Sequence, residues 1–212
     1  MKAVLFAAGE LKPGEWLQRH CREASLLIAV DGGLRHALDA GIKPHLITGD
    51  LDSATAADLR VWEQLPKQLH PVDKSETDLE LALAEAERRG AKEVLVAGAL
   101  GGRQDHSLTN LLLAVRWQQQ GRLSLSLAGA GTIAWPLTTG ELLRLPAAPG
   151  TVFSVVAAEA GCRVSIHGAR YPLHSDELPF GTGLGISNVV ETSAQVSVER
   201  GSVLVMVLND EV

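Results

Sequence analysis

Four apolar runs in the first half of the chain are each followed by an aspartate, where a strand is expected to end. Asp31, Asp50 and Asp73 directly follow their runs, and Asp105 follows Val94–Leu100 and the segment Gly-Gly-Arg-Gln. Ligands of open α/β sheets bind beyond the carboxyl ends of the strands, so these acids should gather at one edge. Carboxylates packed closely repel one another unless they are protonated or bridged by a cation, and oxygen ligands suit magnesium better than zinc. The sequence therefore predicts a magnesium site.

The densest acidic segment is Gly49-Asp50-Leu51-Asp52-Ser53. Residues two apart in extended backbone point the same way, so Asp50 and Asp52 can share one metal while Ser53 begins the next helix. The same residues also fit a polar strand-to-helix turn with Asp52 or Ser53 as an ordinary cap. Residue types alone favour neither interpretation.

The segment Asp73-Lys74-Ser75-Glu76-Thr77-Asp78 also follows a strand and opens a helix. A helix N-terminus offers free N–H groups and a partial positive charge, which suit a phosphate. We expect Lys74 to contact that phosphate and Asp73 the metal. For Glu76 and Asp78, a simple acidic helix start explains the residues equally well.

The glycines of Gly98–Gly102 allow close approach of the backbone to a ligand, and Arg103 can form a fork to phosphate oxygens. Asp105 either joins this site or caps the following helix. In Asp31-Gly32-Gly33, the carboxylate contacts a ribose, contacts the metal, or caps a helix. The sequence has no Walker loop and no G-x-G-x-x-G after the first strand, so metal-bridged aspartates and helix ends would hold a nucleotide phosphate.

Two regions with different patterns must position these residues. Up to about residue 130, short apolar runs alternate with helix-like segments, which predicts a mostly parallel sheet with helices on both faces. The expected strands are 2–8, 26–30, 45–48, 68–72, 93–97 and 124–128. The expected helices are 13–23, 33–40, 53–65, 77–90 and 106–120. Gly41, Gly90 and Gly121 are expected to end three of these helices.

The second region is rich in proline and in short β-branched runs, which predicts an all-β, sandwich-like domain. Its expected strands are 141–145, 151–158, 163–168, 194–199 and 202–208. Residues 196–203 are predicted to form a hairpin, and its second arm, Val203–Leu208, is apolar enough for a central strand. We place an α/β nucleotide- and metal-binding catalytic domain at 1–134 and a β-rich domain at 135–212.

The composition excludes several classes of protein. The chain has 212 residues, 46% of them hydrophobic, and a net charge of −6, which argues against nucleic-acid binding. Cys21 and Cys162 are too far apart in sequence for a disulfide framework or a zinc motif, so we expect reduced thiols. No signal segment or membrane-spanning run is expected, which predicts a cytoplasmic protein without a membrane partner.

The ordered motifs together resemble the thiamin pyrophosphokinase family. They are Asp-Gly-Gly at 31–33, Gly-Asp-Leu-Asp-Ser at 49–53, Asp-Lys-x-x-Thr-Asp at 73–78, Gly-Gly-Arg-x-Asp-His at 101–106 and Gly-Ile-Ser-Asn at 185–188. Each motif is modest, but five in order over nearly the whole chain are specific. Ser75 and Val189 depart from the family pattern, where an acid is common at both positions.

The resemblance implies transfer of a pyrophosphoryl group from ATP to the hydroxyl of thiamin, with magnesium as the cofactor and AMP as the second product. It also implies a homodimer whose β-rich domain holds thiamin near the subunit interface. The implied catalytic and metal-binding residues are Asp50, Asp52 and Asp73. The implied cofactor contacts are Asp31, Ser53, Lys74, Thr77, Asp78, Arg103 and Asp105, and the implied thiamin contacts are Ser187 and Asn188.

Two alternatives remain open from the residues. One is another magnesium-dependent phosphotransferase or phosphohydrolase on the same sheet. The other is a non-catalytic sensor of nucleotide or thiamin, which the departures at Ser75 and Val189 favour. Either Asp52 or Asp73 could accept the proton of the thiamin hydroxyl.

Overall fold

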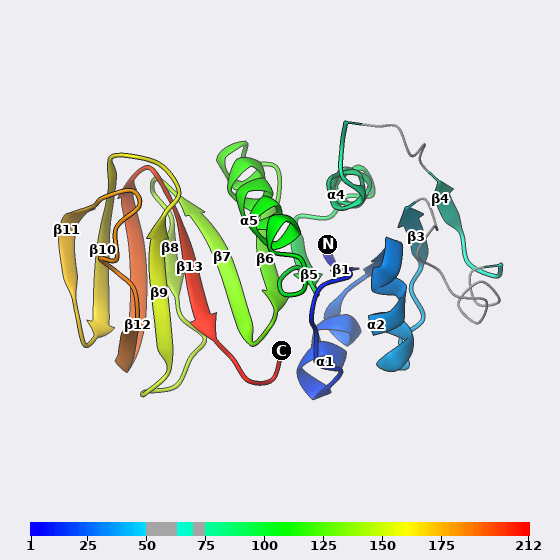
Figure 1. Cartoon of the computed structure of the whole chain (residues 1–212), viewed down its shortest axis with the longest axis horizontal. Helices are drawn as coiled ribbons and strands as arrows, with labels where there is room; N and C mark the ends of the chain where they lie inside the picture. Colours follow the sequence, from blue (N-terminus) through cyan, green and yellow to red (C-terminus); the bar gives the residue numbers. More distant parts are fainter. Residues whose placement is uncertain (50–62, 70–74) are drawn as a thin grey trace.

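A computed structural model describes residues 1–49, 63–69 and 75–212 (Figure 1). Its first half contains six parallel strands in the order β6-β5-β1-β2-β3-β4. These strands are β1 (Lys2–Phe6), β2 (Leu26–Val30), β3 (Leu46–Gly49), β4 (Lys67–Leu69), β5 (Glu93–Ala97) and β6 (Ser124–Gly129). β2 is buried throughout, as expected for a parallel strand covered on both faces.

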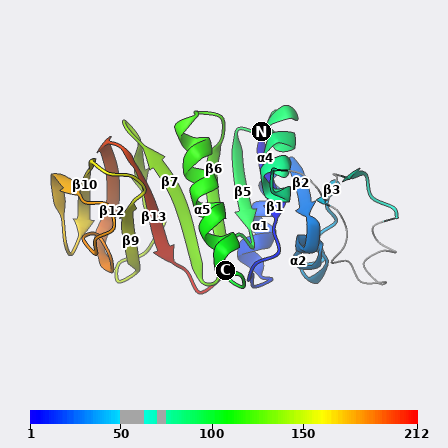
Figure 2. The same ribbon diagram turned by 45° about the horizontal axis from the view of Figure 1, so that its top comes forward.

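Helices cover both faces of this parallel sheet, as the sequence predicts. They are α1 (Glu15–Glu23), α2 (Leu34–Asp39), which follows the short 3-10 helix η1 (Asp31–Gly33), α4 (Asp78–Arg88) and α5 (Gln104–Gln119). Leu17 of α1 and Ala37 of α2 pack on one face, whereas Leu83 of α4 and Trp117 of α5 pack on the other. Figure 2 shows α5 lying across the junction of the parallel half and the β-rich half.

The local sequence explains why α4 begins and ends where it does. The Oγ1 atom of Thr77 accepts a hydrogen bond from the Glu80 backbone N–H at 3.2 Å, which satisfies one free donor of the first turn. Leu79, Leu83 and Ala86 lie on one face of the helix and are buried together in the core. Gly90 has a φ of 90°, the left-handed conformation that ends a helix.

The second half is a two-layered antiparallel structure, which confirms the predicted fold class. Its strands are β7 (Thr132–Thr138), β8 (Leu142–Arg144), β9 (Val152–Ala157), β10 (Cys162–Ala169), β11 (Leu173–Leu178), β12 (Asn188–Arg200) and β13 (Ser202–Leu208). One layer, β9-β13-β7, continues the parallel sheet because β7 pairs with β6. The other layer contains β8, β12, β10 and β11, and the two layers share one buried apolar cluster.

The predicted hairpin at 196–203 is wrong. β12 pairs with β10, β8 and β9, whereas β13 pairs with β7 and β9, so the two strands are not hydrogen-bonded neighbours. Val198 and Val203 are buried in the same cluster between the layers, which makes a crossing from one layer to the other favourable. Gly201, with a φ of 86°, makes this turn. The second arm, β13, is a central strand as predicted.

Two expected elements fall partly outside the described residues. The helix expected at 53–65 is described only from residue 63, and residues 63–65 form a turn. The strand expected at 68–72 is described as β4, which ends at Leu69. In the part of the chain that is described, no helix is long and apolar enough to span a bilayer.

Glu85 on α4 gives the first prediction. Its side chain is only 4% exposed and accepts hydrogen bonds from Arg88 at 2.7 Å and from Arg89 at 2.6 Å. These hydrogen bonds, chiefly those from Arg88, lower the pKa of Glu85 from 4.5 to about 2. We expect Glu85→Gln to lower the free energy of unfolding by about 1–3 kcal/mol at pH 7.

The pH dependence follows from the lowered pKa of Glu85. The ionised carboxylate stabilises the fold fully above the ordinary value of 4.5, and this contribution disappears as the pH falls toward 2. Urea denaturation at pH 7 and at pH 3 measures the difference, with exposed Glu15→Gln as the control. If the loss of unfolding free energy caused by Glu85→Gln is as large at pH 3 as at pH 7, the stabilising role of the ionised Glu85 carboxylate is contradicted.

Candidate functional site

A pocket of about 460 Å³ opens at the point where the order of the parallel strands reverses. From β1 the chain moves to β2, β3 and β4 on one side, and it then returns to β5 on the other side of β1. The helices that follow β1 and β5 therefore pack on opposite faces of the sheet, and ligands of open α/β sheets bind at such a switch point. Ala7–Gly9 and Gly98–Ala99 form this part of the pocket wall.

Five of the predicted site residues line this pocket, although they come from three separate segments. They are Asp31, Thr77, Asp78, Arg103 and Asp105. Asp31 follows β2, Thr77 and Asp78 open α4, and the other two open α5. The carboxyl ends of the strands therefore bring these acidic and basic side chains together in one pocket.

Two helices begin at the pocket. Thr77 is the N-cap of α4 and Arg103 is the N-cap of α5, whose first residue, Gln104, lies two positions before the predicted start. The first N–H groups of a helix lack partners within the helix and carry partial positive charge. Two such ends at one cavity are suited to a ligand with several phosphate groups.

Arg103 and Asp105 form an ion pair at the mouth of the pocket. A guanidinium nitrogen of Arg103 lies 2.6 Å from Asp105 Oδ2, and the side chains are 72% and 64% exposed. The hydrogen bond from Arg103, with a second from the His106 N–H, lowers the pKa of Asp105 to about 2, so this carboxylate is charged at neutral pH. Exposed ion pairs contribute little, so Arg103 can exchange Asp105 for a phosphate oxygen at small cost.

Asp31 adopts an unusual backbone conformation beside the end of β3. Its φ is 48°, which is uncommon outside glycine but tolerated by aspartate. A Cβ atom added to Gly49 would lie only 3.1 Å from the Asp31 Cα, so the two backbones touch. Such strain is often found where a side chain must point in one functional direction.

The remaining predicted cofactor and metal residues lie outside the described parts of the chain. They are Asp50, Asp52, Ser53, Asp73 and Lys74. Within residues 1–49, 63–69 and 75–212, no three His, Cys, Asp or Glu side chains are grouped to hold a metal. The predicted roles of these five residues stay predictions.

Several pocket residues escaped the sequence-based prediction. Thr109 and Asn110 line the pocket one turn further along α5, and the Asn110 amide donates to the Ala99 carbonyl at 2.8 Å. The i, i+4 spacing from Asp105 could have identified Thr109. The small residues Ala7–Gly9 could have been recognised as a place where backbone approaches a ligand.

Ser187 and Asn188 lie in the β-rich half. Ser187 is exposed with a φ of 56°, whereas Asn188 is only 2% exposed. The Asn188 amide donates to the Tyr171 carbonyl at 2.7 Å, and its oxygen accepts from the N–H groups of Tyr171 and Val189. These contacts hold Tyr171 and the start of β12 in place, and a direct contact of Asn188 with substrate stays a prediction.

Strand pairing separates these two residues from the pocket. The register places Asn188 in one row with Phe153, Val207, Ile133, Ala128 and Ala97. Asn188 therefore lies on the same edge of the sheet as the end of β5, but five strands away. At about 4.8 Å per strand, this distance is roughly 24 Å.

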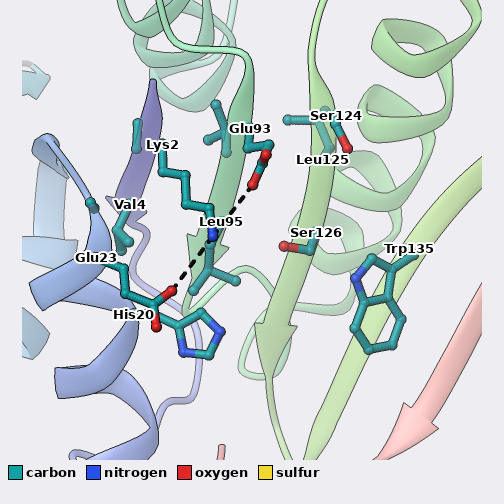
Figure 3. Close-up of a pocket in the computed structure, with 13 residues that line it drawn as sticks. Lys2, Val4, His20, Glu23, Glu93, Leu95, Ser124, Leu125, Ser126 and Trp135 are labelled. Carbon is teal, nitrogen blue, oxygen red and sulfur yellow. Dashed lines mark ion pairs between the residues drawn. The ribbon is translucent and has the colours of Figure 1, made fainter. Parts of the chain in front are cut away.

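A second hollow, of about 240 Å³, lies near the opposite ends of the strands (Figure 3). Lys2 and Glu93, which begin β1 and β5, line it together with His20, Ser126 and Trp135. The Lys2 ammonium is already placed between Glu23 at 3.5 Å and Glu93 at 3.7 Å. Because the amino ends of parallel strands are not the ligand-binding edge, we assign the functional site to the larger pocket.

Comparisons with known proteins give matches to two family models and to a curated relative. Residues 17–125 match the family "Thiamin pyrophosphokinase, catalytic domain", and residues 142–203 match "Thiamin pyrophosphokinase, vitamin B1 binding domain". A curated relative, thiamine pyrophosphokinase of Bacillus subtilis, is 29% identical over 214 residues and covers 98% of both chains.

Solved structures show the same similarity. The crystal structure of thiamine pyrophosphokinase from Bacillus subtilis has a TM-score of 0.86 and 26% identity, covering 99% of this chain and 100% of that chain. The Geobacillus thermodenitrificans structure has a TM-score of 0.84 and 25% identity, with coverages of 99% and 98%. The yeast enzyme shares the fold, with a TM-score of 0.79, 12% identity and coverages of 98% and 86%.

The Asn188 contacts give the second prediction. We expect Asn188→Ala to reduce the free energy of unfolding by about 2–4 kcal/mol, since buried backbone groups of Tyr171 and Val189 lose their partner. Urea denaturation measures this loss. The control is Ser187→Gly, which suits a positive φ and should change stability by less than about 0.5 kcal/mol. Equal stability of Asn188→Ala and the unmodified protein would contradict the assignment.

Proposed function

The chain belongs to the thiamin pyrophosphokinase family, and we propose on this premise that its larger pocket binds ATP and transfers the pyrophosphoryl group to thiamin. The supporting observation is the convergence of two helix N-termini and five motif residues at the switch point of the sheet. Helix ends and Arg103 supply positive charge for the phosphates. Asp31 also lines the pocket, where it can contact the metal or the ribose.

The chemistry of the pocket lining suits magnesium. Asp31, Asp78 and Asp105 bring carboxylate oxygens, the ligands that magnesium prefers, to the pocket wall, but these three are not grouped closely enough to hold an ion by themselves. We propose that Asp31, Asp50, Asp52 and Asp73 hold the ion. When bound, magnesium would offset charge on the phosphates and help align them.

Transfer depends mainly on the positions of the reacting groups. The thiamin hydroxyl oxygen forms a bond to the β-phosphorus, while the bond from this phosphorus to the oxygen bridging the α-phosphate breaks. AMP leaves with that bridging oxygen. The hydroxyl proton passes to a carboxylate, either Asp52 or Asp73. Arg103 and the helix ends hold the phosphates during this exchange.

We further propose that the protein acts as a homodimer. The separation of roughly 24 Å between Asn188 and β5 is longer than a thiamin molecule, so one chain cannot present both predicted ends of the site. Two exposed apolar groups are suited to contact between copies. Leu108 and Leu112 form the first group, on α5 next to the pocket. Phe180 and Leu184 form the second group, in the loop before Ser187.

A cytoplasmic location is also proposed. Both cysteines are free and buried, and burial raises the pKa of Cys21 to about 11, which makes this thiol unreactive. Proteins of reducing compartments keep such unpaired thiols.

The activity is tested by incubation with ATP, magnesium and thiamin, followed by mass detection of thiamin diphosphate and AMP. We expect both products in equal amounts. Asp52→Asn should abolish turnover without loss of the fold, because it removes a metal-binding charge. The control Asp39→Asn, at the exposed end of α2, should keep full activity. Turnover by Asp52→Asn at the unmodified rate would refute the role of Asp52.

The dimer is tested by light scattering after size-exclusion chromatography. Phe180→Asp combined with Leu184→Asp should shift the protein toward monomer and lower turnover at least tenfold, since charges disfavour a buried apolar contact. Leu142→Asp, a change at an equally exposed residue of β8, is the control. A monomeric protein with full activity would contradict the proposal.

A further inference from the structure

We propose that Glu10 is a positioning residue that fixes the glycine loop of the pocket and thereby places Arg103 for the nucleotide. This inference rests on the proposed nucleotide site. Glu10 is absent from the motifs and does not line the pocket. Its contacts connect the loop after β1 to the loop after β5.

The Glu10 carboxylate holds the glycine loop directly. Its Oε1 atom accepts a hydrogen bond from the Gly102 N–H at 2.9 Å, across 92 positions of sequence. A Cβ atom on Gly101 would lie 2.7 Å from the Glu10 Cβ, which is too close. Because residue 101 is glycine, the Glu10 side chain can occupy this space. Gly102 is the residue before Arg103, which means that the carboxylate acts one position from the guanidinium-bearing residue.

The backbone around Glu10 is itself firmly anchored. The Glu10 N–H donates to the Leu100 carbonyl at 2.8 Å, and the Glu10 carbonyl accepts from Ala130 at 3.0 Å. The adjacent Gly9 donates to Gly98 at 2.7 Å, and the His36 Nε2–H donates to the Gly9 carbonyl at 2.7 Å. Glu10 is therefore a fixed point against which the glycine loop can be held.

The glycine loop needs such a restraint. Gly101 and Gly102 have φ values of 86° and 66°, and glycine has more backbone freedom to lose than any other residue. From α5, Asn110 holds the Ala99 carbonyl and Ser107 contacts the Gly101 carbonyl at 3.3 Å. The hydrogen bond from Gly102 to Glu10 adds a restraint at the residue that leads into Arg103.

The test compares Glu10→Ala with Glu10→Gln, which keeps an oxygen acceptor for the Gly102 N–H. We expect Glu10→Ala to lower kcat/KM for ATP roughly five- to tenfold and Glu10→Gln to lose less than about twofold. Glu15→Ala, an exposed change in the first turn of α1, should match the unmodified protein. Hydrogen exchange should be faster in residues 98–106 of Glu10→Ala only, while its Tm stays unchanged.

A double-mutant cycle with Arg103→Ala separates this inference from the proposed function. If Glu10 acts through Arg103, the effect of Glu10→Ala on kcat/KM should largely disappear in the Arg103→Ala background. A full effect in that background, or equal loss in Glu10→Ala and Glu10→Gln, would overturn the positioning role. If Arg103→Ala alone leaves the kinetics unchanged, this result counts against the proposed nucleotide site. In that case, amide hydrogen exchange of residues 98–106 still tests whether Glu10 holds the glycine loop.

Discussion

Close approach of three backbone loops at one edge of the sheet is the constraint on which the pocket depends. A side chain on Gly33 would overlap the Phe6 carbonyl, and one on Gly98 would overlap the Ala7 carbonyl. A Cβ atom on Gly9 would lie 2.6 Å from the Gly98 carbonyl oxygen. Because glycine removes these collisions, the loops after β1, β2 and β5 can lie in contact, and the groups that follow them share one cavity.

The sheet makes this edge continuous with the β-rich half. β7 pairs with the last parallel strand on one side and with β13 on the other, so the edge at β5 continues to β12 without a break. A rigid connection of this kind fixes the distance between the pocket and Asn188, and this distance is the physical basis for proposing a second copy.

Much of the fold could be predicted because its signals are local. Buried parallel strands such as β2 and β5 are short apolar runs, and α4 carries a capping residue, one apolar face and a terminating glycine. β7 and β11 were missed, since Pro136 interrupts one and the other has polar, exposed residues. The hairpin error arose because a sharp turn between two strands does not reveal whether they pair side by side or face each other across a core.

The candidate site also combines features that local sequence signals predict with features that depend on distant contacts. The motif residues that follow β2 and that open α4 and α5 could be predicted to meet, because the carboxyl ends of parallel strands share one edge of the sheet. The predicted meeting of Asp50 and Asp73 with them concerns residues outside the described parts of the chain. The hydrogen bonds of Glu10 with Gly102 and of Asn188 with Tyr171 could not be predicted from the sequence, since each joins residues that are not neighbours in the chain. Glu10 lies in none of the motifs and contacts Gly102 across 92 positions of sequence, so only the packed structure identifies this contact.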